Sequence, residues 1–341
     1  MRRFWIGFLA AILLPYVVTL SWSGSVGGMD PGNMGSRILG SGSGGNLKNG
    51  GLKGDSAVSR RILIQGGQGG SVEAEDYLVG VVARQIQADY ELEAIKAQAI
   101  IARTYLYGQM GEAWEIDEKS LGLETLGENQ MEKKWGEEHF LEYYNKIKQA
   151  VLETEGMVMV AEEGDSDERD LGEDAGEGTL VASPLFHQVS AGKTRDGDLA
   201  HPYLKSVESS RDMEAEGYLT VLEWEPAEIV EKLQGEAALT EAQVLENIQL
   251  VSREASGYVA EIQIGSHMFT GDQVRQLLGL PSAAFSLGAH EGKVRAVCKG
   301  VGHGYGLSQY GAHRLAQDGS RAEEILKYYF QNISVILLGN E

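Results

Sequence analysis

Four alternate glycines near the C-terminal end of the chain mark its most chemically suggestive stretch, which covers residues 300–306. The polar residues His303, Ser308 and Gln309 stand among these glycines or just after them. Because glycine has no Cβ, such a loop lets backbone and polar side chains come close to a ligand. The same spacing is typical of a tight bend before a helix, so both interpretations stay open.

The glycine spacing does not match a nucleotide-binding loop. Tyr305 and Leu307 occupy the positions where G-x-G-x-x-G requires its last glycine, and no Walker lysine–serine pair follows. The 29 Lys and Arg residues against 50 Asp and Glu residues give a formal net charge of −21. A surface of that charge repels phosphate and anionic lipid head groups. We therefore expect no nucleotide cofactor and no nucleic-acid partner.

Two basic residues, Lys96 and Arg103, are seven residues apart in a segment with helical periodicity and share a face with Tyr107. They either line a cleft or extend along the surface with their charged groups in water. A single cysteine, Cys298, excludes an intrachain disulfide and cysteine-rich metal sites. The histidines are scattered and no G-x-S-x-G motif is present, so the sequence predicts no metal and no other cofactor.

Hydrophobic periodicity predicts an α+β fold of helices mixed with antiparallel strands. The expected strands are 61–64, 157–160, 179–182 and two within 251–264, and the expected helices are 91–107, 131–153, 271–278, one ending near 317, and 322–330. Two of the strands form a hairpin around an acidic loop at 161–178, which we interpret as a solvated loop because it lacks EF-hand spacing.

The N-terminus predicts a membrane anchor. Arg2 and Arg3 precede an uncharged run at residues 4–22, whose length is close to the thickness of a bilayer core. The positive flank predicts a cytoplasmic N-terminus and an extracytoplasmic main domain. A cleaved signal peptide is the alternative. Residues 1–22 are thus expected to be the anchor, residues 23–59 a Gly/Ser-rich flexible linker, and residues 60–337 the folded domain.

Several blocks of the chain resemble the stage II sporulation protein D family. The resemblance runs in order from about residue 62 to 333, and its most specific blocks are E-A-I-K-A-Q-A and G-H-G-x-G-x-S-Q-x-G-A. The full set is 75–83, 93–105, 186–194, 202–207, 278–282 and 300–312. The anchor and linker are similar to the membrane-bound form of this family.

This resemblance implies a lytic transglycosylase reaction on peptidoglycan. Such enzymes cut the bond between N-acetylmuramic acid and N-acetylglucosamine with one carboxylic acid, which protonates the leaving oxygen and then accepts the proton of the muramic C6 hydroxyl. In the family this acid is a Glu just before the helix. Here Gln85 occupies that position, and an amide does not deliver and recover a proton at neutral pH.

The resemblance also implies which residues form the site. We expect Gln85, Glu93, Lys96 and Arg103 in the catalytic region, with Asp89 or Glu93 as the nearest carboxylates that could replace the missing acid. The expected substrate-binding residues lie in a glycan-binding cleft: His187, Ser190, Tyr203, Gly302, His303, Gly304, Ser308 and Gln309. A zinc site with cysteine ligands, known in some members, is not expected because Cys298 is far from His187 in sequence.

Two hypotheses follow for the function. In the first, the chain is a membrane-anchored sporulation protein that acts on septal peptidoglycan during engulfment, with a site weakened by Gln85. The resemblance implies partners for it: a peptidoglycan amidase that removes stem peptides, and a multispanning membrane protein as scaffold. In the second, the chain is a non-catalytic glycan-binding module that stimulates the amidase.

Overall fold

The computed structural model describes residues 60–64, 70–162, 179–233 and 239–338. The fold is α+β, as predicted. The expected anchor 1–22, the linker 23–59 and most of the acidic loop 161–178 lie outside the described residues. Among the residues that the structure does describe, no helix combines the length and apolar character needed to cross a membrane.

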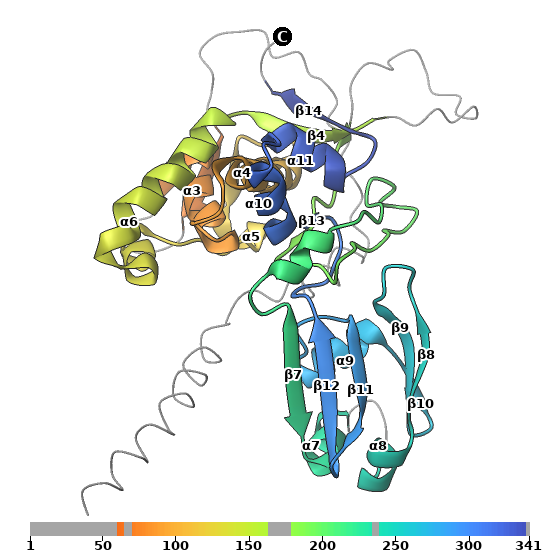
Figure 1. The fold of residues 1–341 in the computed structure, drawn as a ribbon. Coiled ribbons are helices and arrows are strands. Elements are labelled where there is room, and N and C mark those ends of the chain that lie inside the picture. Colours follow the sequence, from red (N-terminus) through yellow and green to blue (C-terminus); the bar gives the residue numbers. More distant parts are fainter. Residues whose placement is uncertain (1–59, 65–69, 163–178, 234–238, 339–341) are drawn as a thin grey trace, which may run out of the picture.

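A helical lobe is built from the two ends of the described chain (Figure 1). Its helices are α3 (Ala74–Gln85), α4 (Leu92–Met110), α5 (Glu118–Leu121), α6 (Glu128–Glu153), α10 (Gln309–Gln317) and α11 (Ala322–Tyr329). Two small sheets complete it, in the orders β2-β1-β3 and β14-β4-β5. Their strands are β1 (Arg61–Ile64), β2 (Gly70–Glu73), β3 (Glu115–Asp117), β4 (Met157–Ala161), β5 (Thr179–Leu180) and β14 (Ile333–Leu337).

Helix α4 is the centre of the helical lobe. The predicted stripe of Ile95, Ala99 and Leu106 packs into one buried cluster with α3 and α6. The opposite face, which includes Ala97 and Ile100, packs into a second cluster with α10, α11 and β4. Because both faces are apolar and rich in alanine, the neighbouring helices approach closely on all sides. This burial explains why the helix carries few exposed polar residues.

Residues 219–299 form a β lobe, which lies below the helical lobe in Figure 1. Its two three-stranded sheets have the orders β11-β12-β7 and β10-β9-β8 and meet at β11 and β8. The strands are β7 (Leu219–Trp224), β8 (Ile248–Arg253), β9 (Val259–Ile264), β10 (His267–Thr270), β11 (Phe285–His290) and β12 (Lys293–Lys299). Helices α7 (Pro226–Leu233), α8 (Glu241–Glu246) and α9 (Gly271–Leu278) pack their apolar sides on them.

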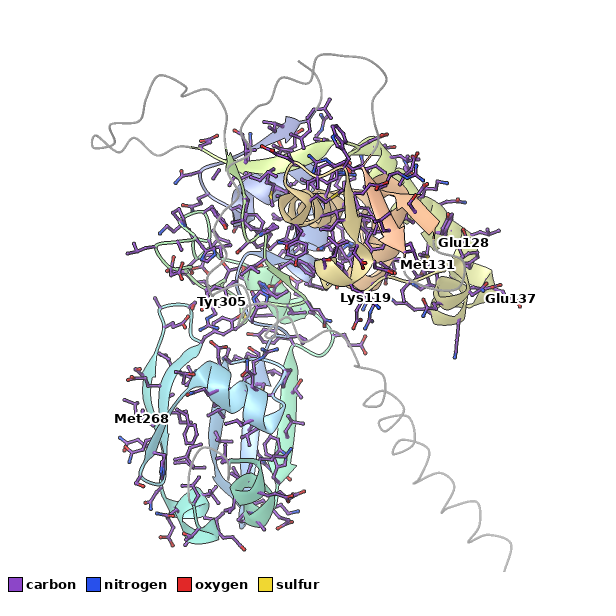
Figure 2. All side chains as sticks on the ribbon, turned by 180° about the vertical axis from the view of Figure 1, so that it is seen from behind. Lys119, Glu128, Met131, Glu137, Met268 and Tyr305 are labelled. Atoms are coloured by element: carbon purple, nitrogen blue, oxygen red, sulfur yellow. The ribbon has the colours of Figure 1, made fainter. Side chains whose placement is uncertain are left out.

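The two lobes are connected by a joint made of residues 183–218 and 300–308. It contains the parallel strands β6 (Phe186–His187) and β13 (Leu307–Ser308) and the short 3-10 helix η1 (Ser210–Glu214). Figure 2 shows Tyr305 of this joint between the lobes. At the neck of the β lobe, the backbone N–H of Gly300 donates to the carbonyl of Tyr218 at 2.8 Å. The β lobe is therefore an insertion whose entry and exit lie side by side.

Candidate functional site

Gln85 is the last residue of α3 and sits at the centre of three hydrogen-bonded glutamines. Its half-buried side chain accepts a hydrogen bond at Oε1 from Nε2 of Gln98 on α4, at 2.9 Å. The Nε2 group of Gln309, the first residue of α10, donates to the backbone carbonyl of Gln85 at 2.8 Å and to Oε1 of Gln98 at 3.1 Å. Residues 224 positions apart in sequence thus meet at one turn.

Gln98 and Gln309 belong to two different motif blocks, and Gln85 stands two residues after a third. The expected meeting of Gln85 with Gln309 is observed, but Gln98 was not among the expected site residues. Gln98 is fully buried on an alanine-rich helix, where its partners lie 13 and 211 residues away in sequence. A buried amide needs partners for both its donor and acceptor groups. The place of Gln98 in the block E-A-I-K-A-Q-A was the sequence signal that could have indicated it.

Aromatic residues flank the turn that follows Gln85. Tyr90 stacks on His313 of α10, with ring centroids 4.6 Å apart, and meets Tyr310 edge-on at 6.3 Å. The backbone N–H of Glu91 donates to Nδ1 of His313 at 3.0 Å. Burial, followed by the nearby Asp89, raises the pKa of Tyr90, so its hydroxyl stays neutral and available as a donor.

Lys96 and Glu93 form a separate ion-pair cluster. The Lys96 ammonium lies 2.6 Å from carboxylates of both Glu93 and Glu153. The second oxygen of Glu93 accepts from the backbone N–H of Ala322 at 2.8 Å, at the start of α11. Glu93 therefore stabilises the N-terminal end of α11, where a negative charge is favoured. Both of its oxygens are occupied, which disfavours it as a substitute acid.

Arg103 is fully buried, so neither the cleft-lining nor the solvent-facing interpretation of it was right. Its guanidinium makes a two-bond contact with the carboxylate of Glu75 at 2.8 and 2.6 Å. It also donates to Thr154 and to the carbonyls of Met157 and Val151. A buried charge requires this many partners. Arg103 therefore ties α3, α4 and the end of α6 together and does not face the Gln85 turn.

The expected binding residues His187 and His303 meet in the joint. Their ring centroids are 5.8 Å apart, and both side chains are buried. Nδ1 of His187 donates to the carbonyl of Tyr305 at 3.0 Å, and Nδ1 of His303 accepts from the N–H of Tyr305 at 3.1 Å. Burial lowers the pKa of His187 to about 4. Burial also lowers the pKa of His303, and the neighbouring His187 and cationic groups lower it further, so both rings are neutral.

The glycine ladder packs against the protein itself. Gly302 and Gly304 have φ angles of 114° and 86°, and a Cβ there would come within 2.6 Å of His187 and 2.4 Å of the Tyr258 ring. Gly300 and Gly306 would meet backbone atoms at 2.6 and 2.1 Å. The loop is a tight bend that leads into α10, as the second interpretation of the spacing predicted. The close approach that its glycines allow here is to the protein itself. Among the described residues, the glycine loop packs against strand β6, the residues on either side of β6, and Tyr258 of the β lobe.

Ser190 and Ser308 lie together around a buried carboxylate that sequence reasoning missed. The backbone N–H of Ser190 donates to Oδ2 of Asp212 at 2.8 Å. Ser308 is the N-cap of α10, accepting from the N–H of Gly311 at 3.3 Å, and its hydroxyl also interacts with Asp212. Burial raises the pKa of Asp212. Because Gln309 follows Ser308 directly, this carboxylate helps to fix the start of α10.

Tyr203 is a core residue. Its side chain is 4% exposed and its hydroxyl accepts from the N–H of Ser183 at 2.9 Å. Ser183 also lies 3.1 Å from Nε2 of His201, whose Nδ1 lies 2.7 Å from Asp198. The three side chains Ser183, His201 and Asp198 are therefore connected in the order of the Ser-His-Asp triad of serine hydrolases. However, Ser183 is only 1% exposed, so we interpret the relay as a connection that holds the 198–203 loop.

The start of α10 is the common point of these groups. Gln309 contacts Gln85 and Gln98, Ser308 contacts Asp212, and strand β13 runs beside His187 in β6. Of these groups only the glutamine group is partly exposed, and only through Gln85, because Gln98 and Gln309 are buried like the histidine and Asp212 groups. Within the described ranges, no three His, Cys, Asp or Glu side chains are arranged to hold a metal ion. The Gln85 turn is therefore the candidate ligand-binding site.

Comparison with known proteins shows which families and proteins this chain is similar to. The model of the Stage II sporulation protein family matches residues 68–160. Stage II sporulation protein D of Bacillus amyloliquefaciens is 29% identical over 277 residues, which cover 78% of this chain and 74% of that protein. Its counterpart in Bacillus subtilis (strain 168) is 29% identical over 281 residues, covering 78% and 75%. This chain is therefore similar to stage II sporulation protein D over most of its length.

The match to the stage II sporulation protein family includes much of the candidate site. Residues 68–160 contain α3, α4 and α6, and with them Gln85 and Gln98. Gln309 lies outside this range, on the C-terminal part of the chain. An uncharacterized protein of Brachyspira hyodysenteriae is also similar, with 25% identity over 276 residues that cover 77% of this chain and 66% of that protein.

Proposed function

We propose that this chain binds glycan strands of peptidoglycan at the Gln85 turn and acts on the cell wall during sporulation. In this proposal the site is of the lytic transglycosylase type, and the strands are denuded, that is, stripped of stem peptides. The observation that carries it is the meeting of Gln85, at the position of the family's acid, with Gln98 and Gln309 from two motif blocks at one partly exposed turn. Glutamine side chains are typical ligands for sugar hydroxyl and acetamido groups because each both donates and accepts.

The same arrangement predicts slow turnover. The Gln85 amide holds no transferable proton at neutral pH. Glu93, one of the nearest carboxylates in sequence, has both oxygens engaged by Lys96 and Ala322. The side chain of Asp89 is exposed at the far end of the turn, where its backbone carbonyl accepts from Lys146. Loss of general acid–base help lowers a rate by roughly 10²–10⁴-fold.

The test is to compare the natural chain with Gln85→Glu on denuded glycan strands, measuring anhydro-muramic products by mass spectrometry. We expect Gln85→Glu to raise turnover, by less than the ~10²–10⁴-fold of full acid–base catalysis. Gln98 would donate to the new carboxylate as it now donates to Gln85, and such a bond favours the ionised form. Lys96 and Arg103 do not oppose the gain, because their charges are paired elsewhere.

The control for this experiment is Gln87→Glu, two residues further on, where the side chain is exposed. It adds the same charge to the same turn without placing a carboxyl group beside Gln98. Equal turnover by the natural chain and Gln85→Glu would show that another group transfers the proton. In that case Asp89→Asn would be the next variant to assay.

A second function is favoured by the amide at position 85, which has no proton to transfer at neutral pH. A chain that binds glycan without cutting it could stimulate a partner amidase by holding the strand. In either function, residues 1–22 would anchor the chain in the membrane with the main domain outside the cytoplasm, and a multispanning membrane protein would serve as scaffold. Amidase turnover measured with and without this chain, on intact peptidoglycan, tests the second function independently of anhydro products.

A further inference from the structure

Helix α6 contains a backbone break that only glycine adopts readily. Gly136 has φ 75° and ψ 157° in the middle of the helix, a region of conformational space essentially closed to other residues. The break turns residues 128–135 away from the line of the following helix. As a result, the ring of Trp135 lies 5.8 Å from that of Tyr143, whereas eight residues of continuous helix would separate them by about 12 Å along the axis.

The break builds a stack of three aromatic rings. Trp135 meets Tyr143 edge-on at an angle of 88°, and His139 stacks on Tyr143 with centroids 5.4 Å apart and 15° between the planes. Trp135 and Tyr143 pack on the core of the helical lobe and are half-buried. The side chain of His139 is 50% exposed. The stack therefore has a fixed inner side and an outer side open to solvent.

Two lysines near the stack bond to backbone carbonyls at the end of α3 and in the Gln85 turn. Nζ of Lys134, the neighbour of Trp135, donates to the carbonyl of Ala83 at 3.0 Å. Nζ of Lys146 donates to the carbonyl of Asp89 at 3.3 Å. His139, Tyr143 and Lys146 are spaced i, i+4 and i+7 and share a helix face. The aromatic face thus continues directly from the turn that carries Gln85.

We propose that Trp135, His139 and Tyr143 form a carbohydrate-binding surface that extends the Gln85 site along a glycan strand. The identity of the ligand rests on the proposed function. Half-buried aromatic rings offer rigid apolar faces at low entropic cost, and the C–H faces of sugar rings are apolar. Each lysine uses one of its three N–H donors on the turn. The remaining donors of Lys134 and Lys146 can bind the lactyl carboxylate of a muramic residue, which is free in a denuded strand.

The test measures binding of the natural chain and its variants to denuded glycan strands, with melting temperature as a check of folding. We expect Trp135→Ala and Tyr143→Ala each to weaken binding about tenfold, as for an aromatic anchor in an interface. Trp135→Phe keeps a ring and should retain most of the affinity. The matched control is Trp114→Ala, which removes a 42% exposed tryptophan beyond the end of α4 and should leave binding unchanged.

Gly136→Ala tests the geometry without removing a ring. It strains the break and should separate Trp135 from Tyr143, so binding should fall while the aromatic content stays the same. Unchanged binding in folded Trp135→Ala and Tyr143→Ala would overturn this inference and leave the proposed function standing. Absence of glycan binding by the natural chain would overturn the proposed function, and the inference with it.

Discussion

Gln85 and His187 both lie next to the start of α10, but Gln85 is partly exposed and His187 is buried. Gln85 is half-buried at a turn, where Gln98 donates to its side-chain oxygen and Gln309 donates to its backbone carbonyl. His187 is 1% exposed and lies in a joint where the backbones touch through glycines. The first group has donors and acceptors that a ligand can share. The second connects the two lobes, so its polar residues stabilise the fold.

The difference shows that one motif can contribute residues both to the candidate site and to the joint between the lobes. The G-H-G-x-G-x-S-Q block places His303 and its glycines in the joint and Gln309 at the site, with Ser308 as the N-cap between them. A sequence rich in polar residues beside glycines suggested one cleft. The structure instead divides these residues between a buried joint and an exposed turn, and variants of each group should behave differently.

The largest effect is expected from Gly304→Ala in the joint. It combines a positive φ with a Cβ position 2.4 Å from the Tyr258 ring. We expect the free energy of unfolding to fall by about 3–4 kcal/mol, from backbone strain and overpacking together. The control is Gly257→Ala, which has a similar φ of 89° and open space around it. Its cost should be about 1 kcal/mol, measured by denaturant unfolding; equal costs would contradict the close packing of the joint.

A smaller effect concerns pH. The unfolded chain protonates His187 near pH 6.5, while burial lowers the folded pKa to about 4. Between these values the unfolded state binds more protons, so stability is present above pH 6.5 and is lost as the pH falls toward 4. The loss should be about 1.4 kcal/mol per pH unit for this residue.

The comparison for the pH effect is His187→Asn, whose amide can still donate to the carbonyl of Tyr305. Its unfolding free energy should change less steeply between pH 6.5 and 4 than that of the natural chain. Asp212 acts in the opposite direction, because burial raises the pKa of that carboxyl, and it is the same in both proteins. Identical slopes would mean that His187 is accessible to protons in the folded state.

The smallest effect on stability is expected at the site. Gln309→Ala removes the donor shared by Gln85 and Gln98 and should lower the free energy of unfolding by about 1 kcal/mol. Binding of denuded glycan should nevertheless fall about tenfold, because Gln85 loses its direct hydrogen bond to α10. A large loss of stability with unchanged binding would reverse the comparison and make Gln309 a residue of the joint.

The elements with regular patterns could be predicted from the sequence. The strand 61–64 and the helix 271–278 have the predicted bounds. Helix α9 ends at Gly279 in the left-handed conformation, as the sequence indicated. The break at Gly136 could not be predicted, because a glycine inside a periodic helix is usually tolerated without a change of direction.

The site itself was predictable only in part. The motif blocks indicated that Gln85 and Gln309 would meet. Gln98 lies in the block E-A-I-K-A-Q-A, but it was not among the expected site residues, because a buried amide is indistinguishable in sequence from a surface one. Arg103 was misinterpreted for a related reason: its carboxylate partner, Glu75, is 28 residues away on another helix. Long-range pairing of polar groups leaves no periodic signal in the sequence, whereas apolar packing does.

The insertion of the β lobe has a consequence for the order of folding. Helices α10 and α11 and strand β14 complete the core around α4, and β14 pairs with β4, which precedes the β lobe in sequence. The core of the helical lobe is therefore complete only after residues near 337 have been synthesised. Until then one face of α4 is uncovered. During synthesis the β lobe can fold earlier from its own contiguous segment and bring the two halves together at the Gly300–Tyr218 contact. The Gln85 turn gains Gln309 only at this last step, so an unfinished chain does not carry an assembled site.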